Sequence, residues 1–388
     1  MSTYDFNQLI PRQHTDSIKW QLYGENVLPL WVADTDFRSP EAVIDALQQR
    51  IAHGVFGYGM DRPELLDVIC QRMADLYNWQ VSPKDIVLLS GLVSGLNITC
   101  RAVGQAGNDV LVQSPVYPPF LTAPVNQDRH VQVVPLMPIQ KGQYLTYDID
   151  FDQLEATITP KTNLFLLCHP HNPIGRSFTI NELEQLATLC AKHQIVICSD
   201  EIHADLLLDG QTHTPMAAIN PEIANNCISL FAPSKTYNIA GLGFSFAIIQ
   251  NPQLKRQFEK AAAGIVPYPN ILGVEAALAA YQKGETWLQN LLHYLRDNRD
   301  FAVNYLTENL PDIKVTHPEA TYLAWLDCRD TSIAANPYDF FLKQASVALN
   351  DGKSFGAGGE GFVRLNFGCP RNTLEQALNQ MHQAYQQL

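Results

Sequence analysis

The sequence predicts an α/β protein with a mostly parallel sheet, joined to a smaller α+β domain. Through the middle of the 388-residue chain, short uninterrupted apolar runs alternate with segments whose apolar residues recur at helical spacing. After about Tyr281 this alternation ends, and a long polar-faced helix leads into short strand-like runs. The chain is also longer than a single simple hydrophobic core accommodates, which favours a large domain and a small one.

Seven apolar runs are the expected strands of the large sheet. They are continuous rather than alternating, which is typical of strands buried on both faces. The runs are 86–89, 110–113, 131–134, 163–167, 195–198, 227–231 and 244–249.

Helices are expected between several of these runs. In "SPEAVIDALQQRIAHG" we expect Ser39 to be the N-cap, Pro40 to be the first helical residue and Gly54 to end the helix. The segment "TINELEQLATLCAKH" carries an apolar stripe at helical spacing. This stripe consists of Ile180, Leu183, Leu186 and Leu189. Nearer the C-terminus, "WLQNLLHYLRDNRDFAVNYLTENL" predicts a long helix, and "ATYLAWLD" and "GFVRLNF" predict strands.

Charge and cysteine usage exclude several classes of protein. The formal net charge of -13 argues against nucleic acid and anionic membranes as partners. The eight cysteines form no C-x-x-C pair, and several, such as Cys168 and Cys198, lie in strand-like runs, as reduced core residues do. The start "MSTYDFNQLI" is too polar for a secretion signal, and no apolar stretch reaches the ~18 residues of a membrane helix. We therefore expect a cytoplasmic protein.

Polar or glycine-rich segments that could bind a ligand or take part in catalysis follow five of the expected strands. "SGLVSG" follows Leu89, "SPVYPPF" follows Gln113, "CHPHNPIG" follows Leu167 and "SDEIHADL" follows Cys198. Lys235 lies just past a fifth strand end, with no acidic residue within several positions. It is either a surface residue of a loop or a nucleophilic amine in a site. Because ligands of open α/β sheets bind outside the carboxyl ends of the strands, all five endings are expected at one edge.

Two of these endings each allow two interpretations. The Ser-Gly turn before a helix near Leu92 is either a phosphate-binding helix start or an ordinary loop. Asp200 is either an N-cap in a solvated turn or the partner of a protonated pyridine nitrogen, with His203 in reach of the same ligand. A metal site is not predicted, because no H-E-x-x-H motif occurs and the Pro and Asn around His169 and His171 indicate a turn.

The glycine-rich run "GAGGEG" at 356–361 matches a dinucleotide fingerprint only formally. It follows the polar "NDGKS" and precedes a strand instead of a helix, so a flexible turn is the better interpretation. The following strand carries Arg364, whose guanidinium needs an anionic partner inside an apolar run. That partner is either a structural Asp or a substrate carboxylate.

Taken together, these segments resemble the fold-type I family of pyridoxal 5′-phosphate enzymes, the aspartate aminotransferase superfamily. More closely they resemble its C–S β-lyase branch, the cystathionine β-lyases of the MalY/PatB type. The segments that carry the resemblance, in the order of that branch, are "VLPLWVADTDFRSP", "HGVFGYG", "SPVYPPF", "CHPHNPIGR", "SDEIHADL", "SKTYNIAGL" and "RLNFGCP". The resemblance covers essentially the whole chain and implies a large domain with a mostly parallel seven-stranded sheet.

The resemblance assigns roles around the cofactor ring. Lys235 would form the Schiff base with the cofactor aldehyde, and Asp200 would pair with the pyridine nitrogen. Asn172 would hydrogen-bond the ring hydroxyl, with His203 nearby, and Tyr117 would stack on the ring. Lys235, Asp200 and Tyr117 would be the catalytic residues.

The resemblance also assigns phosphate ligands. Gly91, Leu92 and Val93 would offer backbone N–H groups, and Ser234 its hydroxyl. Tyr58 would reach the phosphate of a neighbouring subunit, so the active unit would be a homodimer.

The substrate α-carboxylate would be bound by Arg364, with the Ala33 backbone and Asn172 close by. Two positions depart from the pattern of many family members. Ala232 stands where many have Ser, and Gly243 stands where many have a basic phosphate ligand. Binding of the cofactor phosphate would then depend on backbone amides and hydroxyl groups.

The activity implied is cleavage of L-cystathionine or a related S-conjugate of L-cysteine to a thiol, pyruvate and ammonia. The alternatives are an aminotransferase and a regulatory protein that binds a transcription factor. The expected organisation is an N-terminal segment (1–45) joining the small domain, a large cofactor-binding domain (46–285) and a small C-terminal domain (286–388).

Overall fold

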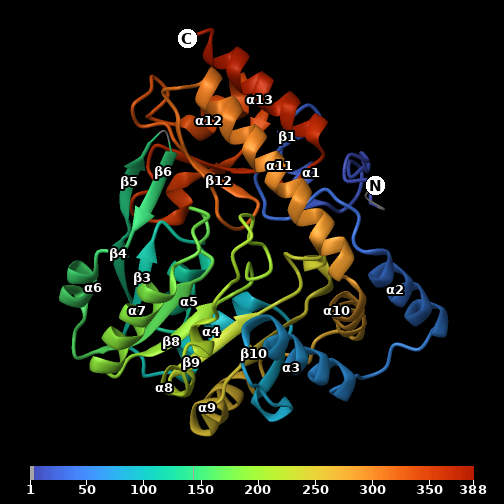
Figure 1. Ribbon diagram of the computed structural model, residues 1–388, viewed down its shortest axis with the longest axis vertical. Coiled ribbons are helices and arrows are strands. Elements are labelled where there is room, and N and C mark those ends of the chain that lie inside the picture. Colours follow the sequence, from blue (N-terminus) through green and yellow to red (C-terminus); the bar gives the residue numbers. More distant parts are fainter. Residues whose placement is uncertain (1–3, 143) are drawn as a thin grey trace.

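The computed structural model describes residues 4–142 and 144–388. A seven-stranded sheet lies in the lower half of the molecule as drawn, and a second sheet lies above it, covered by α11–α13 (Figure 1). The N-terminal segment from residue 4 onward runs beside the second sheet, on the side of the molecule that also holds the C-terminal helix α13. The α/β fold class with a mostly parallel large sheet is confirmed.

The large sheet has the strand order β2-β10-β9-β8-β7-β3-β4. β10 is antiparallel to both of its neighbours, and the other pairs are parallel. Each of the seven predicted strands is present. Their bounds are β2 (Ile86–Leu89), β3 (Asp109–Ser114), β4 (His130–Pro135), β7 (Thr162–Cys168), β8 (Val196–Asp200), β9 (Cys227–Phe231) and β10 (Ser245–Ile248).

Burial follows the position of each strand in this order. β3, β9 and β10 are buried along their whole length, as expected of strands covered on both faces. The prediction of full burial is wrong for β4, whose ends are exposed. As an edge strand, β4 has a neighbouring strand on one side only.

Helices flank the large sheet between its strands. They are α2 (Glu41–His53), α3 (Pro63–Tyr77), α4 (Leu92–Ala102), α5 (Pro119–Asn126), α6 (Phe151–Thr157), α7 (Ile180–Lys192), α8 (Pro221–Asn225), α9 (Pro252–Ala262) and α10 (Ile271–Lys283). Short 3-10 turns lie at Pro83–Asp85, Met216–Ala218 and Ala240–Leu242.

Two details of the predicted helices are wrong. Pro40 has extended backbone angles and is the N-cap of α2, while the Ser39 hydroxyl donates to the Asn238 carbonyl instead of capping. Gly54 ends α2 as predicted, with φ 77°. In α7, Leu183, Leu186 and Leu189 of the predicted stripe are buried, but Ile180, the first residue of the helix, is 54% exposed.

The second sheet has the order β14-β15-β12-β11-β6-β5. Its strands are β5 (Met137–Lys141), β6 (Tyr144–Asp148), β11 (Lys314–Thr316), β12 (Leu323–Asp327), β14 (Asn350–Asp351) and β15 (Phe362–Asn366). β1 (Leu28–Pro29) and β13 (Val347–Ala348) form a separate two-stranded parallel sheet. This pairing attaches the N-terminal segment to the C-terminal part of the chain. The helices here are α1 (Ile18–Gln21), α11 (Glu285–Asn309), α12 (Pro337–Gln344) and α13 (Arg371–Tyr385), with a 3-10 turn at Gly352–Phe355.

The expected domain boundaries at residues 45 and 285 remain a prediction. β5 and β6, from the middle of the chain, pair into the second sheet through β11. The eight cysteines are all free, and seven of them are buried. No helix within residues 4–142 and 144–388 combines the length and hydropathy that crossing a membrane requires.

Candidate active site

A cavity of about 500 Å³ opens at the carboxyl ends of the parallel strands, where the two sheets meet. Segments that follow β2, β3, β7, β8 and β9 all contribute to its walls, as predicted for this edge. Eleven of the twelve site residues predicted from sequence line it. They are Ala33, Gly91, Leu92, Val93, Tyr117, Asn172, Asp200, His203, Ser234, Lys235 and Arg364.

The Lys235 side chain projects into this cavity after β9. Its Nζ donates a hydrogen bond of 2.6 Å to the Ala33 carbonyl, and no carboxylate of the described residues pairs with it. Burial disfavours the ammonium form and lowers the pKa of Lys235 to about 8, although the Asp34 and Asp200 carboxylates oppose this shift. The loop-surface interpretation of Lys235 is therefore wrong, since the amine lies inside a site and its pKa is lowered toward neutral pH.

Asp200 is the last residue of β8 and is buried. Its Oδ1 accepts the Ile202 backbone N–H at 3.1 Å, while none of the hydrogen bonds of the described residues reaches Oδ2. Burial raises the pKa of Asp200 to about 7, and the nearby Glu201 adds to the rise. The carboxylate thus lacks the cationic partner that would keep it ionised.

His203 lies close to Asp200 and is also buried. Its Nδ1 has no hydrogen-bond partner within the described part of the chain. Burial, together with the charges of Lys235 and Arg364, lowers the pKa of His203 to about 3. The imidazole is therefore neutral and can donate or accept one hydrogen bond to a ligand in the cavity.

Arg364 projects from β15, in the second sheet, toward the same cavity. Its Nη1 donates to Asn172 Oδ1 at 2.9 Å, and its Nη2 donates to the Trp31 carbonyl at 3.0 Å and to Asn350 Oδ1. These acceptors are all neutral. Burial lowers the pKa of Arg364 to about 10, so the guanidinium is charged at neutral pH. Of the two partners considered from sequence, a structural Asp is excluded among the described residues.

The first turn of α4 forms another wall of the cavity. Gly91 is the N-cap, and no side chain caps the helix, so the N–H groups that follow Gly91 lack an intrahelical acceptor. A Cβ built at Gly91 would meet nothing within 4 Å. Gly243, with φ 60°, lies opposite, close to the Ser90 carbonyl. Among the residues that line the cavity, Lys235 and Arg364 are the only lysine or arginine side chains.

Tyr58 does not line the cavity. It lies on the loop between α2 and α3 and is fully exposed. The prediction that it serves a neighbouring subunit is not tested by a single chain. No group of three or more His, Cys, Asp or Glu side chains suited to a metal ion occurs within residues 4–142 and 144–388.

The sequence analysis missed two groups that orient Arg364. The Trp31 carbonyl belongs to the backbone, and its position therefore has no signature in the side-chain pattern. Asn350 lies in "ALNDG", which is typical of an ordinary turn, although β14 brings it opposite Arg364 in the sheet. Only the pairing of β14 with β15 reveals this contact.

Comparison with known proteins gives consistent results. The family described as "Aminotransferase class I and II" matches residues 25–381. The chain is 39% identical to cystathionine beta-lyase PatB of Bacillus subtilis (strain 168) over 392 residues, which cover 98% of this chain and 99% of PatB.

Two solved structures show the same fold over almost their full length. Cystalysin from Treponema denticola, whose crystal structure contains a pyridoxal 5′-phosphate cofactor, has a TM-score of 0.93 and 32% identity, and 99% of each chain is covered. The pyridoxal phosphate-bound C–S lyase from Staphylococcus hominis has a TM-score of 0.90 and 32% identity, and 98% of each chain is covered.

Proposed function

Because the chain belongs to the class I and II aminotransferase family, in the branch of the MalY/PatB-type cystathionine β-lyases, we propose that it is a pyridoxal 5′-phosphate-dependent C–S β-lyase. Its substrate would be L-cystathionine or a related S-conjugate of L-cysteine, and its products a thiol, pyruvate and ammonia. The observation that carries this proposal is that Lys235, Asp200 and Arg364 face one cavity, each without an oppositely charged partner in contact among the described residues.

The cavity fits the cofactor in charge and in hydrogen-bonding capacity. Asp200 Oδ2 is available to a protonated pyridine nitrogen, whose positive charge would restore the ionised carboxylate. Asn172 and the unpartnered Nδ1 of His203 suit the ring hydroxyl. The uncapped first turn of α4 and the Ser234 hydroxyl suit the phosphate.

Phosphate binding would depend little on cations of this chain. Gly243 occupies the position of a basic phosphate ligand, and a side chain there would be strained because φ is positive. Lys235 and Arg364 have other roles in the proposed reaction. The helix N-terminus and hydroxyl groups would therefore supply most of the binding energy for phosphate.

When bound, the cofactor supplies an electron sink for the negative charge that develops at the substrate α-carbon. Arg364 would bind the α-carboxylate through two parallel N–H···O bonds and thereby fix the orientation of the α-carbon. The planar fork is held in position by Asn172, Asn350 and the Trp31 carbonyl.

Lys235 would remove the α-proton. A pKa of about 8 is much closer to neutral pH than the ordinary value of lysine, which increases the neutral fraction that a general base requires. Cleavage of the C–S bond then releases the thiolate from the β-carbon. The three-carbon remainder hydrolyses, after release, to pyruvate and ammonia.

An aminotransferase is the second candidate, because the family as a whole carries that name. Both reactions begin with removal of the α-proton, and both would use every residue named above. The 39% identity to PatB over 98% of this chain favours the lyase.

We further infer a homodimer in the cytoplasm. The loop that carries Tyr58 also exposes Val55, Phe56 and Met60, and a second copy of the chain would bury this apolar group. Eight free cysteines agree with a reducing compartment.

The decisive experiment supplies L-cystathionine without any 2-oxo acid. We expect pyruvate, ammonia and homocysteine to accumulate over many turnovers, and Lys235→Ala to form none. A reaction that stops after a single turnover, and resumes when a 2-oxo acid is added, would establish the aminotransferase instead.

A further inference from the structure

The loop at residues 31–36, between β1 and α2, contacts both cationic side chains of the cavity. The Ala33 carbonyl accepts the 2.6 Å hydrogen bond from Lys235 Nζ. The Trp31 carbonyl accepts the 3.0 Å hydrogen bond from Arg364 Nη2. The position of this loop therefore affects the two side chains to which we assign proton removal and carboxylate binding.

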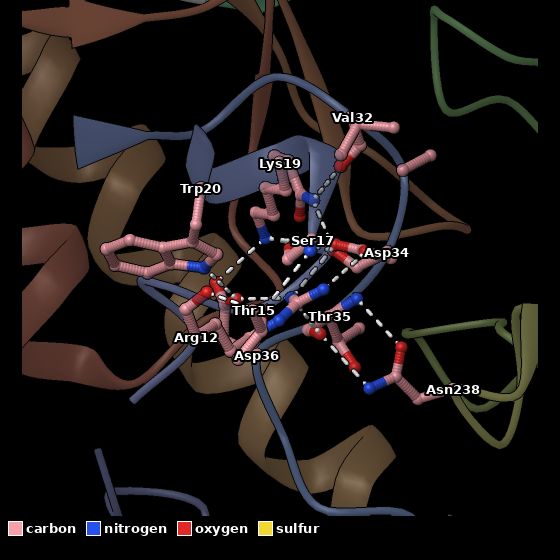
Figure 2. Close-up of polar contacts among 12 residues, drawn as sticks. Arg12, Thr15, Ser17, Lys19, Trp20, Val32, Asp34, Thr35, Asp36 and Asn238 are labelled. Atoms are coloured by element: carbon pink, nitrogen blue, oxygen red, sulfur yellow. Dashed lines mark hydrogen bonds and ion pairs between the residues drawn. The ribbon is translucent and has the colours of Figure 1, made fainter. Parts of the chain in front are cut away.

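Side chains from distant parts of the chain hold the 31–36 loop, since it belongs to no helix or sheet. Asn366 Nδ2 donates to the carbonyls of Val32 and Asp34, at 2.7 and 2.8 Å. Asn238 bonds both backbone groups of Thr35, at 3.1 and 3.0 Å (Figure 2). The structure of the loop is therefore determined by the groups that surround it.

Three N-terminal side chains form hydrogen bonds with the acidic residues of the loop (Figure 2). They are Arg12, Lys19 and Trp20, and we name them the N-terminal clamp. Lys19 Nζ donates to Asp36 Oδ2 at 2.8 Å and to the Asp34 carbonyl at 3.0 Å. Arg12 bonds Asp36 Oδ1 at 2.7 Å and Asp34 Oδ2 at 2.8 Å. Trp20 Nε1 donates to Asp36 Oδ1 at 2.8 Å.

The burial of Lys19 distinguishes the clamp from surface ion pairs. Its side chain is 1% exposed and that of Asp36 is 5% exposed. Charges taken out of water need close, well-oriented partners, because removal of one partner leaves the other charge buried and uncompensated. Two cations of the clamp face the two carboxylates of Asp34 and Asp36, so the local charges balance.

The clamp also connects to the electrostatics of the amine. Asp34 is the carboxylate that most strongly favours the charged form of Lys235, although burial dominates and the pKa is lowered to about 8. The groups that face Lys235 are Asp34, Asp200, Arg364 and His203. Asp34 is the one of these four that the clamp holds directly.

We propose that Lys19 is a positioning residue of the active site, which acts with Arg12 and Trp20 to fix the 31–36 loop against Lys235 and Arg364. Its role passes through the loop, because Lys19 does not line the cavity. The proposal rests on the proposed function for the roles of Lys235 and Arg364. The geometry of the clamp and loop does not depend on which reaction the enzyme performs.

The test compares Lys19→Met with Lys343→Met in the cofactor-loaded enzyme. Both variants exchange a lysine for an uncharged side chain of similar length, but Lys343 is exposed and pairs with Asp339 on α12. Hydrogen exchange is followed at the amides of Thr35 and Asp36, which donate to Asn238 Oδ1 and to the Gly368 carbonyl. Lys19→Met should speed exchange at these amides by at least about tenfold, leaving β12 unchanged, because loss of one cation frees the loop locally.

A second measurement separates positioning from stability. Turnover is expressed per cofactor-loaded subunit, well below the melting temperature of each variant. We expect kcat/KM to fall by about 10- to 100-fold in Lys19→Met, since small displacements of catalytic groups cause losses of this size. Lys343→Met should match the wild type in both measurements.

Three outcomes would overturn the proposal. One is wild-type exchange at Thr35 and Asp36 in Lys19→Met. Another is faster exchange throughout the protein, with turnover per loaded subunit unchanged, which would assign Lys19 to stability alone. If Lys19→Met does not fold, Trp20→Phe takes its place, because it removes one donor to Asp36 and keeps a ring. That variant should show a smaller, equally local increase in exchange, and wild-type exchange there is the third overturning outcome.

Failure of this proposal is distinguishable from failure of the proposed function. The exchange rates require only a folded, loaded enzyme. A wild-type protein that forms no pyruvate from thioethers would refute the lyase and leave the exchange comparison valid.

Discussion

At the scale of single residues, Arg364 is the side chain that most directly supports the proposed recognition of a substrate carboxylate. Its guanidinium is buried, charged and in contact with neutral oxygens only. A charge buried in this way remains electrostatically unsatisfied until an anion arrives. In the proposed function the substrate carboxylate would complete the site, and part of the binding energy would come from satisfying a charge that the fold leaves unpaired.

We predict that Arg364→Lys raises KM by about 10- to 100-fold, since a charge-assisted hydrogen bond contributes about 1.5–3 kcal/mol and lysine lacks the planar fork. The change in kcat should be much smaller. Steady-state kinetics with a thioether substrate would measure both. Arg329→Lys is the matched control, because Arg329 pairs with Asp327 outside the cavity. An unchanged KM in Arg364→Lys would place the carboxylate elsewhere.

Much of the site could be predicted from the sequence at this scale. Lys235 and Asp200 follow recognisable strand ends, and parallel strands bring their carboxyl ends to one edge. The contacts that orient Arg364 could not be predicted in the same way. A backbone carbonyl such as that of Trp31 has no signature of its own, and Asn350 becomes a partner only through strand pairing.

At the scale of elements, the continuous apolar runs were sufficient to find every strand of the large sheet. Helix starts were less certain, because a cap is decided by local geometry. Ser39 has the right residue type for an N-cap, but its hydroxyl bonds the Asn238 carbonyl, 199 residues away in sequence. This tertiary contact overrides the local preference.

We predict that Thr179→Ala lowers the free energy of unfolding by about 1 kcal/mol. Thr179 and Glu182 form a capping box, in which Thr179 Oγ1 accepts the Glu182 N–H and Glu182 Oε2 accepts the Thr179 N–H. The thermal midpoint and the exchange rate of the Glu182 amide would report the loss.

Thr188→Ala in the same helix is the control for this prediction. The Thr188 hydroxyl bonds the Glu184 carbonyl within the exposed face of α7, where alanine is a better helix former. We expect no loss of stability there. Equal losses in the two variants would show that the capping box contributes nothing specific.

At the scale of the whole molecule, the sequence predicted β12 and β15 of the second sheet but could not predict that β5 and β6 join them. β5 and β6 lie between strands of the large sheet in sequence, yet they extend the C-terminal sheet through β11. Their apolar pattern does not encode a partner, since it shows which face of a strand is buried and not which strand lies beside it. The 31–36 loop likewise joins both sheets at the cavity only in the folded chain.

The assembly of two such molecules is the remaining question at this scale, and Tyr58 makes it testable. Tyr58 is fully exposed in the single chain and lies outside its cavity. If it completes the phosphate site of a second subunit, each active site takes Lys235 from one subunit and Tyr58 from the other. Tyr58→Phe and Lys235→Ala then alter the two different subunits that form one site. A heterodimer of the two variants would then contain one site with both native residues and one site with neither.

We predict that this heterodimer, isolated with two different affinity tags, recovers about half of wild-type activity although both parent homodimers are impaired. The heterodimer of wild type and Lys235→Ala should show the same half activity, because it too has one intact lysine site. If Tyr58 served the cavity of its own chain, the mixed dimer would carry one defect in each site and would be no more active than the Tyr58→Phe homodimer. Activity measured before and after tag-selected purification therefore decides which subunit Tyr58 serves.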